Sequence, residues 1–165
     1  RSGVLTVLQN MGADITVINQ NSRSGEPAAD LLVRTSRLHG TCIEGELIPT
    51  LIDEIPILAL TACFAEGETI IRDAAELKVK ESNRLKVMAE GLSSMGARVQ
   101  ETEDGMIIQG GAPLHGAVID RGMAPRIAMP FAVAGLCADG DTEILGAECV
   151  NISYPQFYED LKNLA

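Results

Sequence analysis

The chain has 165 residues, of which 46% are hydrophobic, and its mean hydropathy of +0.14 indicates a globular protein rather than a disordered or fibrous one. A formal net charge of −10 argues against a nucleic-acid-binding or anionic-membrane surface. No apolar run reaches the length of a membrane span, and no signal peptide is visible. We therefore expect a single globular region over residues 1–165, a cytoplasmic location, and small anionic molecules as the remaining class of ligand.

The first part of the chain predicts a helix followed by a β-hairpin. Apolar residues recur at helical spacing over 4–11, and Gly12 is placed to end the helix in the left-handed conformation. Residues 14–18 alternate in polarity, and residues 31–34 form the expected returning strand across a polar loop. A short strand around residues 42–44 is expected next.

A second helix is predicted to begin at Asp53, with the Asp53 side chain as its N-cap. Pro56 is tolerated in the first turn, where its missing N–H removes no helical hydrogen bond. Residues 57–64 are almost wholly apolar, so we expect this helix to be buried on most sides. A turn is predicted near Pro49 ahead of the helix, and a strand over 69–72 after it.

Charged side chains crowd residues 77–85, just before and inside the start of a third predicted helix. A helix N-terminus attracts phosphate and carboxylate groups, because its amides are unpaired and its dipole is positive there. Lys80 and Arg84 would add full positive charges, and Glu81 would place beside a bound anion a carboxylate that can exchange a proton. The alternative is a solvated helix face, where mixtures of Lys, Glu and Arg are common.

The helix that follows these charges is predicted to bury one face. Ser82 and Asn83 are both candidate N-caps for it. Lys78 and Lys86 could extend the positive cluster even in an acidic protein, because salt screens charges farther away than roughly 8 to 10 Å. The buried face is expected to consist of Leu85, Met88, Leu92 and Met95.

The second half of the chain predicts the same order of elements as the first. Residues 98–102 and 106–109 read as a hairpin, 127–138 as an almost entirely apolar helix, and 142–145 as a strand. An amphipathic helix over 155–164 follows. The chain has no Gly-rich phosphate loop, HExxH, GxSxG or Rossmann fingerprint, which makes a nucleotide-dependent or metal-dependent enzyme an unfavoured reading.

An internal repeat accounts for this order. Three short motifs recur at offsets that shrink from 84 to 76 to 73 residues, so each unit reads helix, strand, strand, strand, helix, strand. The last offset makes Asp53 and Arg126 equivalent positions in successive units. An acid and a base therefore stand at the starts of equivalent helices. The plainer alternative is that Asp53 only caps its helix and that Arg126 is only solvated. The motif pairs are 11–13 with 95–97, 38–40 with 114–116, and 64–67 with 137–140.

The cysteines are scattered in apolar surroundings and lack the C-x-x-C spacing of metal sites. We interpret them as reduced core residues of a cytosolic protein, with a metal site or disulfides as the alternative. No metal ligand set is predicted. The four residues are Cys42, Cys63, Cys137 and Cys149.

The sequence KVKESNRL, following a strand and leading into a helix that ends at M-G-A, closely resembles the 5-enolpyruvylshikimate-3-phosphate synthase family. The resemblance extends over essentially the whole chain, through I-D-E-I-P at 52–56 and S-Y-P at 153–155. It implies an α+β fold of β-α-β-α-β-β units, the inside-out α/β barrel type of the enolpyruvyl transferases. Family members have two halves of three units each, with substrates bound between them. The chain would then supply about two units of one half, and the N-terminal portion of the enzyme would be missing.

The resemblance also implies a reaction. The family transfers the enolpyruvyl group of phosphoenolpyruvate to the 5-hydroxyl of shikimate 3-phosphate and releases phosphate, without a cofactor, in aromatic amino acid biosynthesis. By motif, Asp53 matches the residue that binds the acceptor hydroxyl, and Glu81 matches the group that gives and later removes the methylene proton. Lys80 matches a residue near the acceptor hydroxyl and the phosphate, while Arg84 and Arg126 match clamps on phosphoenolpyruvate.

One departure from the family pattern concerns the start of the last apolar helix. The family usually reads Asp-His-Arg there, whereas this chain reads Ala124-Pro125-Arg126, which puts the orientation of Arg126 in doubt. Two alternatives remain open: UDP-N-acetylglucosamine enolpyruvyl transferase, whose motif at the central helix start differs, and a non-catalytic scaffold fragment. We expect the isolated chain to turn over little or nothing.

Overall fold

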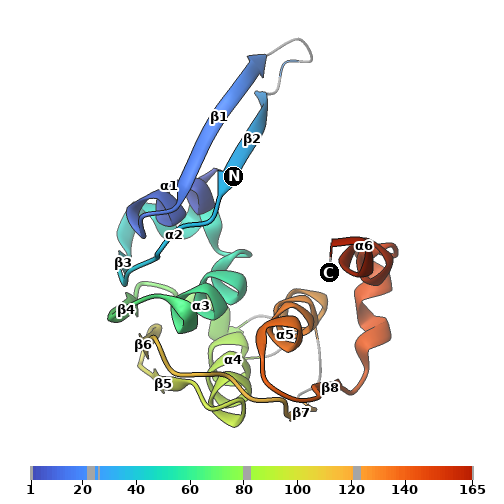
Figure 1. The fold of residues 1–165 in the computed structure, drawn as a ribbon. Helices are drawn as coiled ribbons and strands as arrows, with labels where there is room; N and C mark the ends of the chain where they lie inside the picture. Colours follow the sequence, from blue (N-terminus) through green and yellow to red (C-terminus); the bar gives the residue numbers. More distant parts are fainter. Residues whose placement is uncertain (1, 22–24, 26, 80–82, 121–123, 165) are drawn as a thin grey trace.

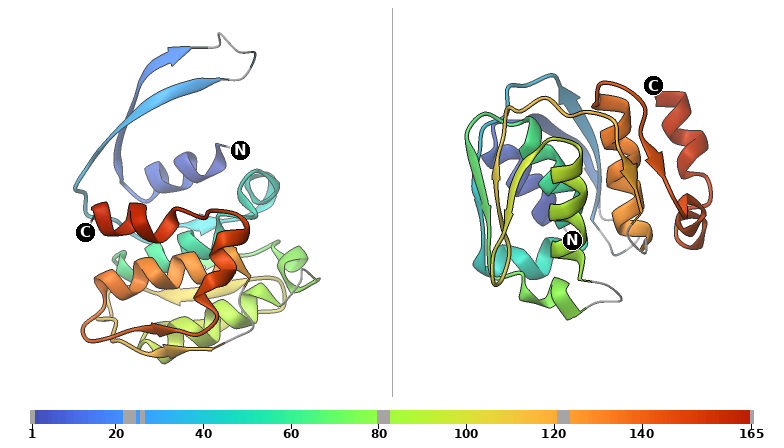
Figure 2. Two further views of the ribbon diagram at one scale, coloured as in Figure 1. Left: turned by 90° about the vertical axis from the view of Figure 1, so that its right-hand side faces the viewer. Right: turned by 90° about the horizontal axis from the view of Figure 1, so that it is seen from below.

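A computed structural model of the protein describes residues 2–21, 25, 27–79, 83–120 and 124–164. Three helices pack against one another in the middle of the molecule, and the strands lie to the outside of them (Figures 1 and 2). These helices are α3 (Ile55–Phe64), α4 (Arg84–Ser94) and α5 (Pro125–Cys137). This mixture of central helices and peripheral sheet confirms the predicted α+β class.

The first unit follows the predicted order. Gly12, at φ +90°, ends the first helix in the left-handed conformation that glycine adopts without steric cost. Both hairpin strands are longer than predicted, because the polar residues beside the loop continue the antiparallel ladder. The elements are α1 (Gly3–Asn10), β1 (Asp14–Asn21), β2 (Ala28–Arg34), β3 (Cys42–Ile43), α3 and β4 (Glu68–Ile71).

A short helical insertion separates β3 from α3. It consists of the 3-10 turn η1 (Gly45–Leu47) and α2 (Ile48–Leu51). The turn predicted near Pro49 is therefore wrong. Pro49 lies at the start of α2, where a proline needs no N–H partner and its fixed φ suits the helix.

The second unit repeats the first and is followed by two further elements. Gly96, at φ +92°, ends α4 as Gly12 ends α1. The 3-10 turn η2 (Ala75–Val79) precedes the unit. The unit comprises α4, β5 (Arg98–Glu101), β6 (Met106–Gln109), β7 (Val118–Ile119), α5 and β8 (Glu143–Ile144), and the chain continues with η3 (Ala147–Ile152) and α6 (Phe157–Leu164).

Equivalent backbone hydrogen bonds confirm the internal repeat. In each unit the amide of the histidine donates to the methionine at the end of the first helix, and the next glycine amide donates across to the segment after the second helix. The bonds run from His39 to Met11 (2.9 Å), His115 to Met95 (2.8 Å), Gly40 to Glu66 (2.8 Å) and Gly116 to Asp139 (2.7 Å).

One sheet crosses the boundary between the units. Its strand order is β3-β4-β6-β5, with β3 parallel to β4 and the β5–β6 hairpin of the second unit antiparallel to β4. Among the described residues, β1–β2 and β7–β8 each form a separate two-stranded sheet. The two units are therefore joined by strand pairing as well as by helix packing.

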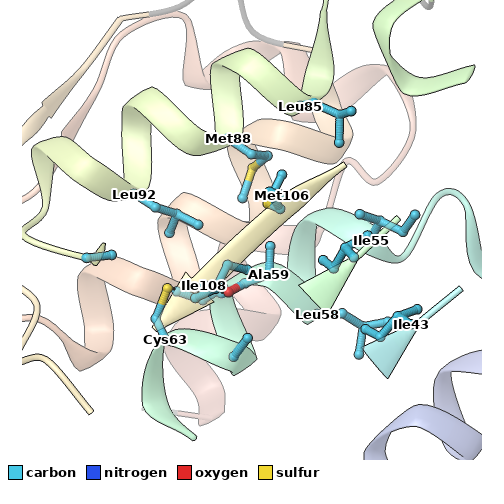
Figure 3. Close-up of a cluster of buried hydrophobic side chains, with 14 of the residues drawn as sticks. Ile43, Ile55, Leu58, Ala59, Cys63, Leu85, Met88, Leu92, Met106 and Ile108 are labelled. Atoms are coloured by element: carbon cyan, nitrogen blue, oxygen red, sulfur yellow. Dashed lines mark hydrogen bonds between the residues drawn. The ribbon is translucent and has the colours of Figure 1, made fainter. Parts of the chain in front are cut away.

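The core lies between this sheet and the central helices (Figure 3). Met106 and Ile108 of β6 are fully buried, and their side chains lie among residues of α3 and α4. The predicted apolar face of α4 is confirmed, because all four of its residues are at most 1% exposed. They are Leu85, Met88, Leu92 and Met95.

Helix α3 is buried on most sides, as its apolar sequence predicts. Among the described residues, no single helix is both long enough and apolar enough to cross a membrane. The bent pair of Gly45–Leu51 and Ile55–Phe64 passes that test only when the two segments are taken together.

All four cysteines are free thiols, as the sequence predicts. Their interpretation as core residues is right for Cys63, which is buried, and wrong for Cys42 and Cys137, which are exposed. Cys137 is the last residue of α5, where the helix reaches the surface.

Candidate active site

The N-terminus of α4 positions the first candidate residue, Arg84. Asn83 is the N-cap, and its side-chain oxygen accepts a hydrogen bond of 3.1 Å from the backbone N–H of Lys86. The neighbouring Leu85 is fully buried, so the first turn of the helix is anchored in the core. Arg84 is itself only 3% exposed, and a guanidinium at such a position requires compensation by negative charge.

Asp53 provides that charge. Its Oδ1 lies 3.4 Å from Arg84 Nη1, and its Oδ2 lies 3.2 Å from Arg126 Nη2. The Asp53 side chain is 14% exposed, so little water screens these contacts. The structure thus brings together three of the residues that the sequence singled out, from three different parts of the chain.

The prediction that Asp53 is an N-cap is wrong. The N-cap residue of α3 is Glu54, in a helical backbone conformation, and its side chain makes no capping hydrogen bond. The two carboxylate oxygens of Asp53 instead face Arg84 and Arg126 in charge-assisted contacts.

Arg126 lies in the first turn of α5 and is 48% exposed. The N-cap residue Ala124 has extended backbone, with φ −76° and ψ 148°, and makes no side-chain hydrogen bond. Pro125 then starts the helix. The carboxylate facing Arg126 therefore comes from Asp53 of the first unit, and the reading of Arg126 as merely solvated is wrong.

The contacts around Asp53 bring together the N-terminal ends of α3, α4 and α5. Each such end contributes roughly 0.3 to 1 kcal/mol to the binding of an anion placed at it. Arg84 and Arg126 add full positive charges, and the planar guanidinium group matches the geometry of carboxylate and phosphate. The arrangement is therefore suited to a small anion near the exposed guanidinium of Arg126.

Lys80 and Glu81, the other two candidate residues, lie outside the described residues, as does the candidate cap Ser82. In sequence they stand directly between Val79 at the end of η2 and the Asn83 cap of α4. Their assigned roles stay predictions.

Lys78 and Lys86 do not extend the positive cluster as the sequence suggested. Lys78 Nζ donates to the backbone oxygen of Thr102 at 3.1 Å and lies 3.5 Å from Glu101, at the β5 hairpin. Lys86 is paired with Glu90 one helical turn along α4, at 3.8 Å. Both ammonium groups are compensated locally.

Glu54 is a further side chain at this site that the sequence did not single out. Its Oε2 is buried and has no hydrogen-bond partner within the described part of the chain. Only its position next to Asp53 could have drawn attention to it. No group of three or more His, Cys, Asp or Glu residues among the described residues could hold a metal ion.

Comparison with known proteins shows which family this chain is similar to. Residues 1–161 match the family model of EPSP synthase (3-phosphoshikimate 1-carboxyvinyltransferase). A curated relative from Synechococcus sp. (strain JA-3-3Ab), named 3-phosphoshikimate 1-carboxyvinyltransferase, is 57% identical over 99% of the chain and 37% of the relative. A relative of the same name from Roseiflexus castenholzii is 53% identical over 99% of the chain and 38% of the relative.

Solved structures give the same result. An EPSP synthase from Acinetobacter baumannii superimposes with a TM-score of 0.94 at 43% identity, over 99% of this chain and 38% of that protein. The enolpyruvyl transferase NikO from Streptomyces tendae shares the fold, with a TM-score of 0.74 at 23% identity over 99% of this chain and 35% of NikO. The chain spans less than two fifths of the length of these relatives. It belongs to the EPSP synthase family.

Proposed function

We propose that this chain is part of an enzyme that transfers the enolpyruvyl group of phosphoenolpyruvate to the 5-hydroxyl of shikimate 3-phosphate and releases phosphate. The observation that carries the proposal is the carboxylate of Asp53 held between Arg84 and Arg126 at the N-terminal ends of the central helices. The reaction needs cations that hold a phosphate and a carboxylate, and a carboxylate near the attacking hydroxyl. Family membership supports the same reading.

The proposed roles follow the order of bond changes. The acceptor hydroxyl adds to the enolic carbon of phosphoenolpyruvate as its proton passes to a base, for which Asp53 is proposed, with Lys80 near the hydroxyl. Glu81 protonates the methylene carbon, which gives a tetrahedral intermediate. The same group then removes a proton as the C–O bond to phosphate breaks. Arg84 and Arg126 hold the anionic groups throughout.

The partner of this chain would be the rest of the same enzyme. We propose that the described region is two repeat units of one half of a two-domain transferase, which matches the fraction of its relatives that it covers. The isolated 165 residues would then present half a cleft and turn over little or nothing. The acidic charge disfavours nucleic acid or anionic membrane as a partner, and the free thiols suit a cytoplasmic location.

A transferase that uses UDP-N-acetylglucosamine is the second candidate, since the two reactions share phosphoenolpyruvate chemistry. The KVKESNRL sequence disfavours it, because that family has a different motif at the start of the central helix. The likeness to NikO bears only on the fold and supports neither acceptor.

The test is phosphate release from phosphoenolpyruvate by the chain recombined with the N-terminal portion of a family member. Release with shikimate 3-phosphate and not with UDP-N-acetylglucosamine is the expected result, and Glu81→Gln should abolish it. Glu103→Gln, in the exposed turn between β5 and β6, is the matched control and should retain activity. A folded complex that releases no phosphate with either acceptor would favour the scaffold alternative.

A further inference from the structure

The two arginines of the candidate site share one carboxylate. Asp53 Oδ1 faces Arg84 Nη1 at 3.4 Å, and Asp53 Oδ2 faces Arg126 Nη2 at 3.2 Å. Guanidinium groups bind the carboxylate and phosphate groups of ligands through the same N–H donors that they offer to a carboxylate side chain. Asp53 therefore contacts the two groups to which the proposed function assigns the anionic substrate.

The geometry of these contacts is not the tightest that the groups allow. Charge-assisted contacts between a guanidinium nitrogen and a carboxylate oxygen have distances of about 2.7 to 2.9 Å when they are short. Both contacts of Asp53 are longer, and its two oxygens are divided between two arginines instead of both facing one of them. An anion with better geometry can therefore replace Asp53 as the partner of either arginine.

Burial determines how an anion meets this carboxylate. Arg84 is 3% exposed and needs negative charge nearby, whereas Arg126 is 48% exposed and can be reached from solvent. Asp53 is 14% exposed and lies between the two guanidinium groups. An anion that approaches Arg126 is repelled by Asp53 at short range, where little water screens the repulsion.

We propose that Asp53 is an internal competitor of the anionic substrate for Arg84 and Arg126. The inference rests on the proposed function, which places that substrate at these two arginines. To bind, the anion must draw the guanidinium groups away from Asp53, and the free energy of this exchange lowers its affinity. The carboxylate thus positions the arginines and weakens the binding of an anion at the same time.

The competition would favour release of the product anion. Inorganic phosphate is the anion that the proposed reaction releases, and it would have to leave a site with two guanidinium groups. The return of Asp53 to Arg84 and Arg126 would replace the contacts that the phosphate gives up. Small anions other than the substrate would also be kept weakly bound.

Removal of the Asp53 charge should therefore strengthen anion binding. Asp53→Asn keeps the shape of the side chain and an oxygen that accepts hydrogen bonds from guanidinium, but it removes the competing charge. Phosphoenolpyruvate should bind the Asp53→Asn chain roughly tenfold more tightly than the unsubstituted chain at constant ionic strength. A positioning role alone predicts weaker binding, and a role only as the base for the acceptor hydroxyl predicts no change.

Calorimetric titration of the 165-residue chain measures the affinity, and thermal unfolding gives an independent readout. A ligand that binds only the folded state raises the unfolding temperature. Phosphoenolpyruvate should raise it more in Asp53→Asn than in the unsubstituted chain, although the variant unfolds at a lower temperature without ligand. Asp53→Ser, which also lacks the charge, should show the same direction, and inorganic phosphate is the second probe.

Asp14→Asn is the matched control. It changes the net charge by the same amount and removes another Asp–Arg ion pair, between Asp14 Oδ2 and Arg34 Nη1 at 3.6 Å. That pair lies in the β1–β2 hairpin, which projects away from α4 and α5 (Figure 1). The control should bind phosphoenolpyruvate as the unsubstituted chain does, and a gain equal to that of Asp53→Asn would assign the effect to net charge and overturn the proposal.

The remaining outcomes separate this inference from the proposed function. Adding Arg126→Gln to Asp53→Asn should remove the gain, because the accessible guanidinium is lost. Affinity that is unchanged, lower or undetectable in both uncharged Asp53 variants overturns the competition. Phosphate release by the recombined enzyme is measured separately, so the transferase proposal can fail while the gain in affinity is seen, or hold while it is not.

Discussion

The two β-hairpins have the same place in the internal repeat and opposite surroundings. In the second unit, β5–β6 is held between β4 and the central helices, and Met106 and Ile108 are fully buried. In the first unit, every residue of β2 is exposed. Both hairpins are antiparallel, and the exposed one has the longer ladder, so the difference in burial arises from the neighbour each one meets and not from strand pairing. A residue that is buried where the two units meet should therefore contribute more to the free energy of unfolding than its equivalent in the exposed hairpin.

The largest expected effect tests this difference directly. Met106→Ala should lower the free energy of unfolding by about 2 to 5 kcal/mol, because it removes a fully buried side chain and leaves a cavity. Leu31→Ala, at the equivalent position of the open hairpin, should cost less than about 1 kcal/mol in the monomeric chain. Urea unfolding at low protein concentration measures both. Equal losses would mean that the two hairpins are equally packed in solution.

The second comparison is between Asp53 and Arg126, which hold equivalent positions in successive units. Asp53→Asn should destabilise the chain by about 1 to 3 kcal/mol, because it weakens the charge compensation of the buried Arg84. Arg126→Gln should change stability by less than about 1 kcal/mol, because the arginine is 48% exposed. Thermal unfolding of both variants checks the order. A larger loss for Arg126→Gln would contradict the view that Asp53 serves mainly Arg84.

The sequence predicts the repeat and the buried faces well, because both depend on local spacing. Gly12 and Gly96 mark the helix ends, and alternation marks the hairpins. The prediction from sequence fails for residues whose contact partner comes from a distant part of the chain. Asp is a residue type that often caps helices, yet the Asp53 carboxylate pairs with two arginines that lie more than 30 residues away in the sequence. Likewise, no pattern in β2 or β6 says which hairpin another strand will cover.

Helix ends give a third comparison, between Cys63 of α3 and Cys137 of α5. Burial raises the pKa of the Cys63 thiol from 9.0 to about 12, whereas Cys137 is exposed. A thiol-specific reagent at neutral pH should therefore label Cys137 quickly and Cys63 only on unfolding. Because the folded state keeps Cys63 protonated while the unfolded state ionises near pH 9, stability should fall as pH rises from 9 toward 12.

The size of that pH effect can be isolated with substitutions. One pH unit above 9, the Cys63 contribution should be a loss of about 1 kcal/mol. Cys63→Ala should remove this component of the alkaline slope, and Cys137→Ser should leave it unchanged. Equal slopes in the two variants would show that other groups cause the alkaline loss of stability.

The smallest expected effect concerns the two helix starts that carry the arginines. Helix α4 has the Asn83 cap, whereas the N-cap residue of α5 is Ala124, whose extended backbone already suits a capping side chain. Asn83→Ala should cost about 1 kcal/mol, and Ala124→Asp should gain about 0.5 to 1 kcal/mol. The gain is modest because Ala124 is only 8% exposed, so part of it offsets desolvation of the new carboxylate.

Ala124→Asn separates capping from charge in this last comparison. An amide cap can accept the same backbone hydrogen bonds but carries no charge to form an ion pair with Arg126, so an equal gain from Ala124→Asn and Ala124→Asp would assign the effect to the cap and not to charge. A gain from the carboxylate only, lost in high salt, would mean that it competes with Asp53 for Arg126. In that case the Ala124→Asp chain should tolerate Asp53→Asn with a smaller loss of stability than the unsubstituted chain does, which a double-mutant cycle measures as a coupling energy between the two positions.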